Sequence, residues 1–143
     1  MIRTLVFLSV LCGAAPAFAV ECPADQRGVF VHLVRPSDRQ QGVTEETLGA
    51  IELGAYQLPG RNLRTRKLIV EPGGIIAWHN HATRPALTYV LQGEMTEVRA
   101  SCGAPLIYRA GDIVVEDAGV AHWWRNEGTA PAVLVSTDLM PAN

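Results

Sequence analysis

The sequence has no excess of positive charge, and this narrows the possible partners. Its 143 residues include 12 Lys and Arg against 14 Asp and Glu, a formal net charge of −2 at pH 7. Nucleic-acid-binding domains typically carry a basic patch or stripe, often with aromatic side chains between the charges. The densest positive stretch, residues 61–67, is explained more simply as a solvated strand and turn. We therefore expect no nucleic-acid partner.

Helical periodicity is nearly absent as well. No segment longer than about two turns repeats apolar residues at helical spacing, although residues 44–48 could form a single turn. From Leu48 onward, short apolar runs alternate with glycine and proline turn signals at spacings of roughly 8–15 residues. This pattern is typical of an all-β sandwich or barrel. We expect strands over 50–58, 66–71, 75–81, 86–99, 106–108, 112–116, 122–126 and 132–138.

A long hydrophobic run is missing except at the start of the chain. There, Arg3 is followed by an apolar stretch over 5–11 and by the small-residue sequence Ala17-Phe18-Ala19. This is the layout of a secretory signal peptide spanning residues 1–19, with cleavage after Ala19. The apolar run is interrupted by Pro16 and is shorter than the ~20 residues of a membrane span, so a retained anchor is the weaker alternative. We expect a secreted or periplasmic protein with no membrane attachment after cleavage.

The remaining 124 residues suffice for one domain with one core. Removal of residues 1–19 takes away Arg3 and changes the net charge to −3. Residues 20–47 are rich in polar side chains, proline and glycine around the short apolar run 29–31. We expect an N-terminal arm with one edge strand over 20–47, followed by a barrel over 48–143.

Cysteine is scarce, and its distribution predicts one cross-link. Cleavage removes Cys12 and leaves Cys22 and Cys102. An even pair in an exported chain favours a disulfide, with two free thiols as the alternative. Neither cysteine has histidine neighbours at nucleophile or zinc spacing. We therefore assign both a structural role.

Histidine is also scarce, yet two of the four histidines lie two residues apart. Alternate side chains of a β-strand point to the same face, so His79 and His81 can bind one metal ion together. The third ligand must come from another strand. His122 is the candidate, because the remaining histidine, His32, lies in the arm and is explained more simply as a surface or packing residue. Imidazole donors favour iron(II), nickel, copper or zinc over calcium or magnesium.

At this point the sequence resembles the cupin superfamily, in particular its small quercetin-dioxygenase-like members. The family has two spaced motifs that begin with glycine and contain the histidines. The first motif corresponds to Gly73, His79, His81, position 86 and Gly93. The second corresponds to Gly111, Asp117, Gly119, His122 and Asn126. The resemblance covers residues 73–126 and implies a single-domain double-stranded β-helix, the jelly-roll barrel.

Two positions depart from the family pattern. Asp117 replaces a proline, which changes only a turn, whereas Ala86 replaces the glutamate that usually completes the metal site. A divalent ion held by three neutral histidines keeps its full charge, leaves about three coordination positions open and prefers an anionic ligand. Four acidic residues could supply a replacement, although the last two lie close to a turn: Glu94, Glu97, Glu116 and Asp117. A site that no longer binds metal is the alternative.

Strand alternation also predicts the surroundings of the site. Thr88 shares the inward face with position 86, and Trp124 should line a pocket, although ordinary core packing would explain it equally. Arg84 follows the histidine pair and could bind an anionic group at the pocket mouth, or simply lie on the surface. Trp78 and Trp123 should point outward, against other strands or a second subunit. The resemblance implies a homodimer.

The preferred function is a metal-dependent, dioxygenase-type oxidoreductase acting on a small anionic or phenolic compound. Iron(II) is the first choice of metal, because some cupin dioxygenases have three-histidine iron sites. The alternative is a non-catalytic cupin, a sensor or carrier of a metal or small ligand, and a structural barrel with an empty pocket is the third hypothesis. The sequence identifies no second catalytic group facing the ion, so no residue is assigned a catalytic role.

Overall fold

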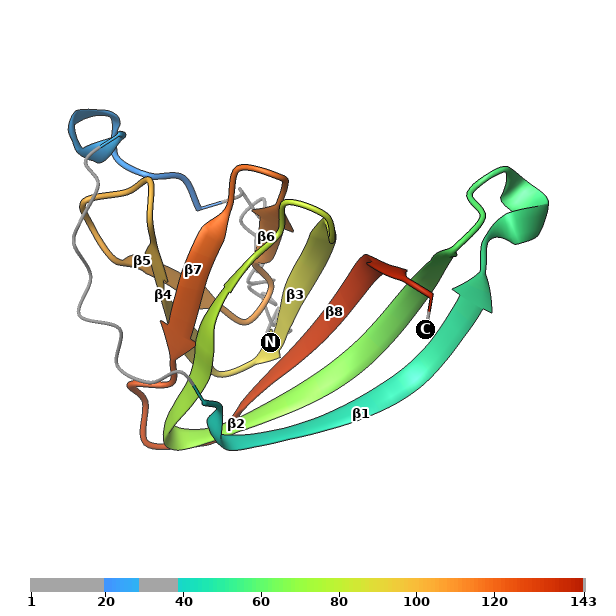
Figure 1. Cartoon of the computed structure of the whole chain (residues 1–143). Coiled ribbons are helices and arrows are strands. Elements are labelled where there is room, and N and C mark those ends of the chain that lie inside the picture. The colour runs from blue at the N-terminus through green and yellow to red at the C-terminus, as the bar shows by residue number, and fades with distance from the viewer. Residues whose placement is uncertain (1–19, 29–38, 143) are drawn as a thin grey trace, which may run out of the picture.

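The computed structural model describes residues 20–28 and 39–142 and consists almost entirely of β-strands (Figure 1). Two short 3-10 helices, η1 (Ala24–Gln26) and η2 (Gly54–Tyr56), accompany the strands. The strands are β1 (Gln41–Glu52), β2 (Arg61–Asn80), β3 (Ala86–Gln92), β4 (Glu94–Arg99), β5 (Leu106–Arg109), β6 (Ile113–Glu116), β7 (Ala121–Arg125) and β8 (Ala132–Pro141).

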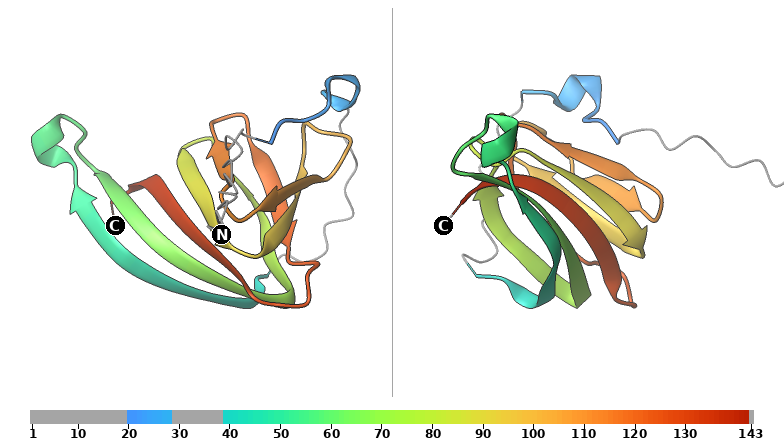
Figure 2. Two further views of the ribbon diagram at one scale, coloured as in Figure 1. Left: turned by 180° about the vertical axis from the view of Figure 1, so that it is seen from behind. Right: turned by 90° about the vertical axis from the view of Figure 1, so that its right-hand side faces the viewer.

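The strands form one antiparallel sheet in the order β5-β4-β7-β2-β8-β3-β6, and β1 pairs with β2 outside this path. Figure 2 shows the sheet curling into a nearly closed barrel, with the hairpin of β1 and β2 reaching away from its body. Apart from β4 with β5 and β1 with β2, neighbouring strands are not consecutive in sequence, as expected for a jelly roll. The fold class expected from the sequence, an all-β barrel, is confirmed.

β2 is a long strand near the centre of the sheet, and it replaces two strands that the sequence predicts. The sequence predicts separate strands over 66–71 and 75–81 around a Pro-Gly-Gly turn, but 66–71 and 75–80 belong to one strand of 20 residues. The chain bends at Gly73, whose φ of +75° favours glycine. Asn126 fixes this bend: the Gly73 N–H donates to its carbonyl at 2.8 Å, and its own N–H donates to the Gly74 carbonyl at 3.0 Å. The bend carries the strand from the outer hairpin into the histidine site.

The expected strand over 50–58 is wrong, because β1 ends at Glu52 and the chain then turns through η2. The possible helical turn over 44–48 is also wrong, because these residues lie inside β1. Polar cross-strand pairs stabilise this part of the hairpin: Glu45 pairs with Arg66 at 3.0 Å and Glu46 with Lys67 at 2.7 Å. A strand formed through charged pairs shows no apolar alternation in its sequence, so the pattern missed it.

Inward side chains of the strands fill the barrel, among them Leu68, Val90, Met95, Trp124 and Leu134. The expected strand over 86–99 is divided at Gly93 into β3 and β4. Gly93 has a φ of +80°, and a Cβ on it would lie 2.9 Å from the Ala132 Cα. Only glycine therefore fits this turn, as the cupin-like motif requires.

The segment 20–28 is fixed to the barrel by the predicted disulfide between Cys22 and Cys102. Backbone hydrogen bonds flank it: Gly28 N–H donates to the Ser101 carbonyl, and Gly103 N–H to the Gln26 carbonyl. The predicted signal peptide, the apolar run 29–31 and His32 lie outside the described residues. Among the residues described, no helix is long and apolar enough to span a membrane.

Candidate metal centre

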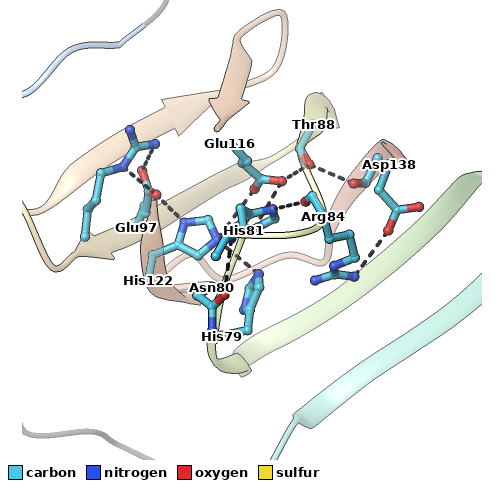
Figure 3. A network of polar contacts seen from close by, with 12 residues as sticks. His79, Asn80, His81, Arg84, Thr88, Glu97, Glu116, His122 and Asp138 are labelled. Carbon is cyan, nitrogen blue, oxygen red and sulfur yellow. Dashed lines mark hydrogen bonds and ion pairs between the residues drawn. The ribbon is translucent and has the colours of Figure 1, made fainter. Parts of the chain in front are cut away.

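The structure brings the three predicted histidines together inside the barrel (Figure 3). His79 lies near the end of β2 and His81 directly follows this strand, and His122 lies on β7 as the register partner of His79. The His122 Nε2 atom is 3.0 Å from His79 Nε2 and 3.1 Å from His81 Nε2. His81 and His122 are buried, and His79 is partly exposed toward the cavity described below. One atom of each ring therefore faces a common point.

The other nitrogen of each ring is held by an oxygen that can only accept a hydrogen bond. His79 Nδ1 donates to the Ala77 carbonyl and His81 Nδ1 to the Arg84 carbonyl, each at 2.8 Å. His122 Nδ1 donates to the carboxylate of Glu97. These contacts place the proton on Nδ1 in all three rings and leave the Nε2 lone pairs toward the shared point, as in metal sites with ordered outer-shell partners.

The arrangement of the three rings is suited to binding one cation. Burial, reinforced by the positive charge of neighbouring groups, lowers the pKa of His79 to about 3 and that of His81 to about 4. Both imidazoles are therefore neutral at neutral pH. The three Nε2 atoms lie within about 3 Å of one another around one point, and this arrangement could hold a metal ion. The donor set fits iron(II), nickel, copper or zinc.

Glu97 is the buried partner that positions His122. Burial alone would raise its pKa, but the hydrogen bond and charge of His122 and the guanidinium of Arg99 hold that pKa below its usual value. Arg99 donates to both carboxylate oxygens, at 2.9 and 3.0 Å, and the Tyr108 hydroxyl donates to Oε2 at 2.9 Å. With its oxygens thus occupied, Glu97 fixes the orientation of the His122 ring.

Glu116 is a second buried carboxylate, at the end of β6. It is 4% exposed, and its oxygens lie 3.7 Å from His81 Nε2 and 3.7 Å from His122 Nε2. Burial is the main reason that its pKa is raised. The sequence suggested Glu97 and Glu116 only as two of four possible replacements. Their contacts depend on pairing between distant strands, which no local pattern encodes.

A cavity of about 240 Å³ opens beside the histidines. Thr88, Arg84 and Trp124, the predicted pocket residues, all lie in its wall, together with His79 and His81. Thr88 points inward and hydrogen-bonds Glu116, and Trp124 is buried against the His122 ring.

Trp78 also lines this cavity, although alternation predicted an outward side chain. The register between β2 and β7 shifts between Ile76 and His79, which breaks the simple alternation at this point. Trp123 is half-buried.

Three arginines gather around one buried aspartate next to the cavity. Arg64 binds Asp138 with two hydrogen bonds, at 2.8 and 3.1 Å, and Arg66 and Arg84 reach the same carboxylate at 3.3 and 3.2 Å. Of these arginines, Arg66 and Arg84 also line the cavity. Arg66 also pairs with Glu45 at 3.0 Å, and Glu116 lines the same cavity, so the guanidinium groups on this wall lie beside carboxyl groups.

Comparison with known proteins agrees with this architecture. A germin-like protein 5-1 from Oryza sativa subsp. japonica is 32% identical over 104 residues, covering 66% of this chain and 47% of the relative. A solved structure described as a predicted oxalate decarboxylase from Thermotoga maritima matches with a TM-score of 0.57 at 20% identity, covering 85% of this chain and 92% of that one.

A recombinant oxalate oxidase, solved in complex with glycolate, matches with a TM-score of 0.52 at 19% identity and covers 68% of this chain and 50% of that one. The chain spans less than half the length of the germin-like protein, and less than half that of a second relative, the rhicadhesin receptor of Pisum sativum. The family model of the cupin domain matches residues 66–138, the part that carries the histidines, the cavity wall and Asp138. The chain belongs to the cupin family.

Proposed function

We propose that the protein is an exported, metal-dependent oxidoreductase of the dioxygenase type, acting on a small anionic compound. One observation carries the proposal: three Nε2 atoms converge while each Nδ1 is fixed by an acceptor. A chain that only packed histidines would gain nothing from aligning three lone pairs. His79, His81 and His122 would hold the ion, with iron(II) as the first candidate.

The cavity supports a small, negatively charged substrate. Its volume of about 240 Å³ lies below the range typical of pockets that bind drug-sized ligands. Arg84 and Arg66 supply positive charge on the wall beside the histidines, and guanidinium groups bind carboxylates well. The names of two structural neighbours, a predicted oxalate decarboxylase and an oxalate oxidase with glycolate, suggest small carboxylates as the first compounds to assay.

The roles of this chain's residues follow from their positions. When bound, the ion would supply an acidic, redox-active centre at which substrate and dioxygen, the oxidant, could meet. Arg84 would orient the substrate's anionic group, and Trp78 and Trp124 would shield one side of the cavity from water. Glu97 would keep His122 in its ligating tautomer.

The test is oxygen uptake by mature protein loaded with iron(II), using oxalate, glycolate and catechol as probes. We expect one class of probe to stimulate uptake, and His81→Ala to abolish it. Tight metal binding without turnover of any probe would instead favour the non-catalytic sensor or carrier.

Export is part of this proposal and is supported by the disulfide, because such bonds persist in oxidising compartments. Mass spectrometry of the protein recovered from the periplasm or medium should find Val20 at the N-terminus. Recovery of a chain that still begins at Met1 in the cytoplasm would contradict it.

We also propose a homodimer formed through the outer face of β3 and β6. Outward side chains of paired residues form an apolar surface there: Leu87 pairs with Val115 and Tyr89 with Ile113, and all four are 37–51% exposed. The face is continuous with Val135 of β8, the partner of Tyr89. A second copy of the same face would cover it symmetrically.

Light scattering on the purified protein should give twice the chain mass, and a Leu87→Lys/Val115→Lys variant should give the monomer mass. A monomeric wild type at micromolar concentration would overturn the proposed dimer without affecting the metal site.

A further inference from the structure

Glu116 stands directly opposite the alanine that occupies the glutamate position of the family motif. Ala86 on β3 and Glu116 on β6 are register partners in an antiparallel pair. Opposite residues in such a pair point to the same face of the sheet, and here both are buried, at 7% and 4% exposure. The Glu116 carboxylate therefore enters the barrel beside position 86, where the family motif usually has its glutamate.

The two carboxylate oxygens face different histidines. Oε2 lies 3.7 Å from His81 Nε2, and Oε1 lies 3.7 Å from His122 Nε2 (Figure 3). Because Nδ1 of each ring donates to an oxygen, Nε2 is the atom that faces the carboxyl group of Glu116. At 3.7 Å these contacts are too long for hydrogen bonds, so the carboxyl group lies beside the rings without bonding to them directly. A cation among the three rings would satisfy the carboxylate as well.

Thr88 holds the carboxylate in this orientation. Its hydroxyl is 3.2 Å from Glu116 Oε2 and 2.9 Å from the Ser136 hydroxyl, which lies on β8. Hydroxyls from two neighbouring strands thus form a short chain that ends on the glutamate. Hydrogen bonds of this kind commonly fix the orientation of a carboxylate that binds a metal.

We propose that Glu116 is the fourth protein ligand of the metal, supplied by β6 in place of the missing motif glutamate on β3. This inference rests on the proposed metal site and adds one residue to it. Two consequences follow. The ion and its protein ligands would carry a charge of 1+ rather than 2+, and an octahedral ion would keep about two open positions rather than three. The substrate class would then be small anions that bind through two neighbouring oxygens.

The other acidic residues considered for this role are occupied elsewhere. Glu97 binds His122 Nδ1, on the far side of the ring from the shared point. Glu94 pairs with Arg109 on the surface at 3.0 Å, and Asp117 accepts the Gly119 N–H at 2.9 Å. Among the described residues that we considered as replacements, Glu116 is therefore the one whose oxygens face the Nε2 atoms.

The first test compares metal affinity in wild type, Glu116→Gln and His122→Ala by competition with a chelator. Cobalt(II) is the probe, because its visible absorption reports ligand number and type. Glu116→Gln keeps the shape of the side chain, so folding should be preserved. We expect its affinity to fall by more than about 100-fold, beyond the 10–100-fold typical of outer-shell partners, with a changed cobalt spectrum. Glu94→Gln, a surface control, should match wild type.

The second test moves the carboxylate back to β3. Glu116→Ala should bind cobalt(II) weakly, and Ala86→Glu/Glu116→Ala should recover both the affinity and a four-ligand spectrum. A purely structural glutamate would not be rescued from the opposite strand. If Glu116→Gln binds cobalt(II) with wild-type affinity and spectrum while His122→Ala does not, the three-histidine site stands and this inference is overturned. If wild type binds no metal, the proposed function itself fails.

Discussion

Glu97 accepts a hydrogen bond from His122 inside the barrel, and both side chains are fully buried. The pair joins β4 to β7 and fixes which nitrogen of the ring faces the cavity. A carboxylate in this position also makes the imidazole a better donor to a metal ion. The pair thus links the buried polar network of the barrel to the proposed metal site.

The first prediction concerns this pair. Glu97→Gln keeps an acceptor for His122 Nδ1 but removes the negative charge, so we expect metal affinity to fall by about 10–100-fold. Chelator competition measures the change. Tyr108→Phe is the matched control, because it removes one hydrogen bond to Glu97 and leaves the pair intact. Equal affinity in Glu97→Gln and wild type would show that the carboxylate does not tune the site.

The second prediction concerns the arginine cluster. Asp138→Asn would leave Arg64, Arg66 and Arg84 without their shared buried counter-charge. Because the guanidiniums are partly exposed, solvent reduces the cost, and we expect the free energy of unfolding to fall by about 1–3 kcal/mol. Urea denaturation measures it. Glu46→Gln, which breaks the exposed pair with Lys67, should change stability by less than about 0.5 kcal/mol. Similar losses in both variants would contradict the argument.

The third prediction is the pH dependence of that difference. Burial alone would raise the pKa of Asp138, but the hydrogen bond from Arg64 and the charges of Arg66 and Arg84 hold it below its ordinary value of 3.8. The unfolded chain therefore takes up this proton first as the pH falls, and the stabilisation is lost below that value. The stability gap between wild type and Asp138→Asn should stay constant from neutral pH to about pH 5 and shrink under more acidic conditions. A gap that widens in acid would contradict the sign of the shift.

The fourth prediction concerns the disulfide between Cys22 and Cys102, which are separated by 80 residues. The chain-entropy model gives a loop of this length roughly 4–5 kcal/mol, and measured losses run from about 2 to 5 kcal/mol. Cys22→Ser/Cys102→Ser should lose stability within that range in a denaturant titration. Adding a reductant should destabilise wild type and leave the variant unchanged. Identical stability of the two proteins would show that the link contributes nothing.

The fifth prediction distinguishes the role of the Arg84 backbone carbonyl from that of its side chain. Its carbonyl holds His81, whereas its side chain lines the cavity. Arg84→Met keeps the backbone contact, so metal binding should be unchanged, while oxalate should bind the metal-loaded protein about tenfold more weakly or worse. Arg64→Met is the control, because it also loses Asp138 but does not line the cavity. Equal oxalate binding in all three proteins would remove Arg84 from the substrate site.

The sequence predicted the parts of this site that depend on local spacing. Strand alternation placed His79 and His81 on one face, and the spaced motif placed His122 opposite them, as the structure confirms. Thr88 and Trp124 lie inward for the same reason. The barrel itself was predictable from the glycine-marked strands and the cupin-like motifs.

The remaining features depend on long-range register. Glu116 faces the histidines because β6 pairs with β3 at Ala86, and the orientation of Glu97 depends on the pairing of β4 with β7. The sequence pattern did not predict β1 because this strand pairs with β2 through charged residues, such as Glu45 and Glu46, and has no alternating apolar face. The direction of Trp78 depends on a local register shift that alternation cannot foresee.

The measurement that tests the central claim most directly is elemental analysis of the mature, exported protein beside a His79→Ala/His122→Ala variant. The account predicts about one equivalent of a transition metal per chain in wild type and essentially none in the variant. A wild-type protein that carries no metal, and takes up neither iron(II), nickel, copper nor zinc when they are supplied, would contradict it.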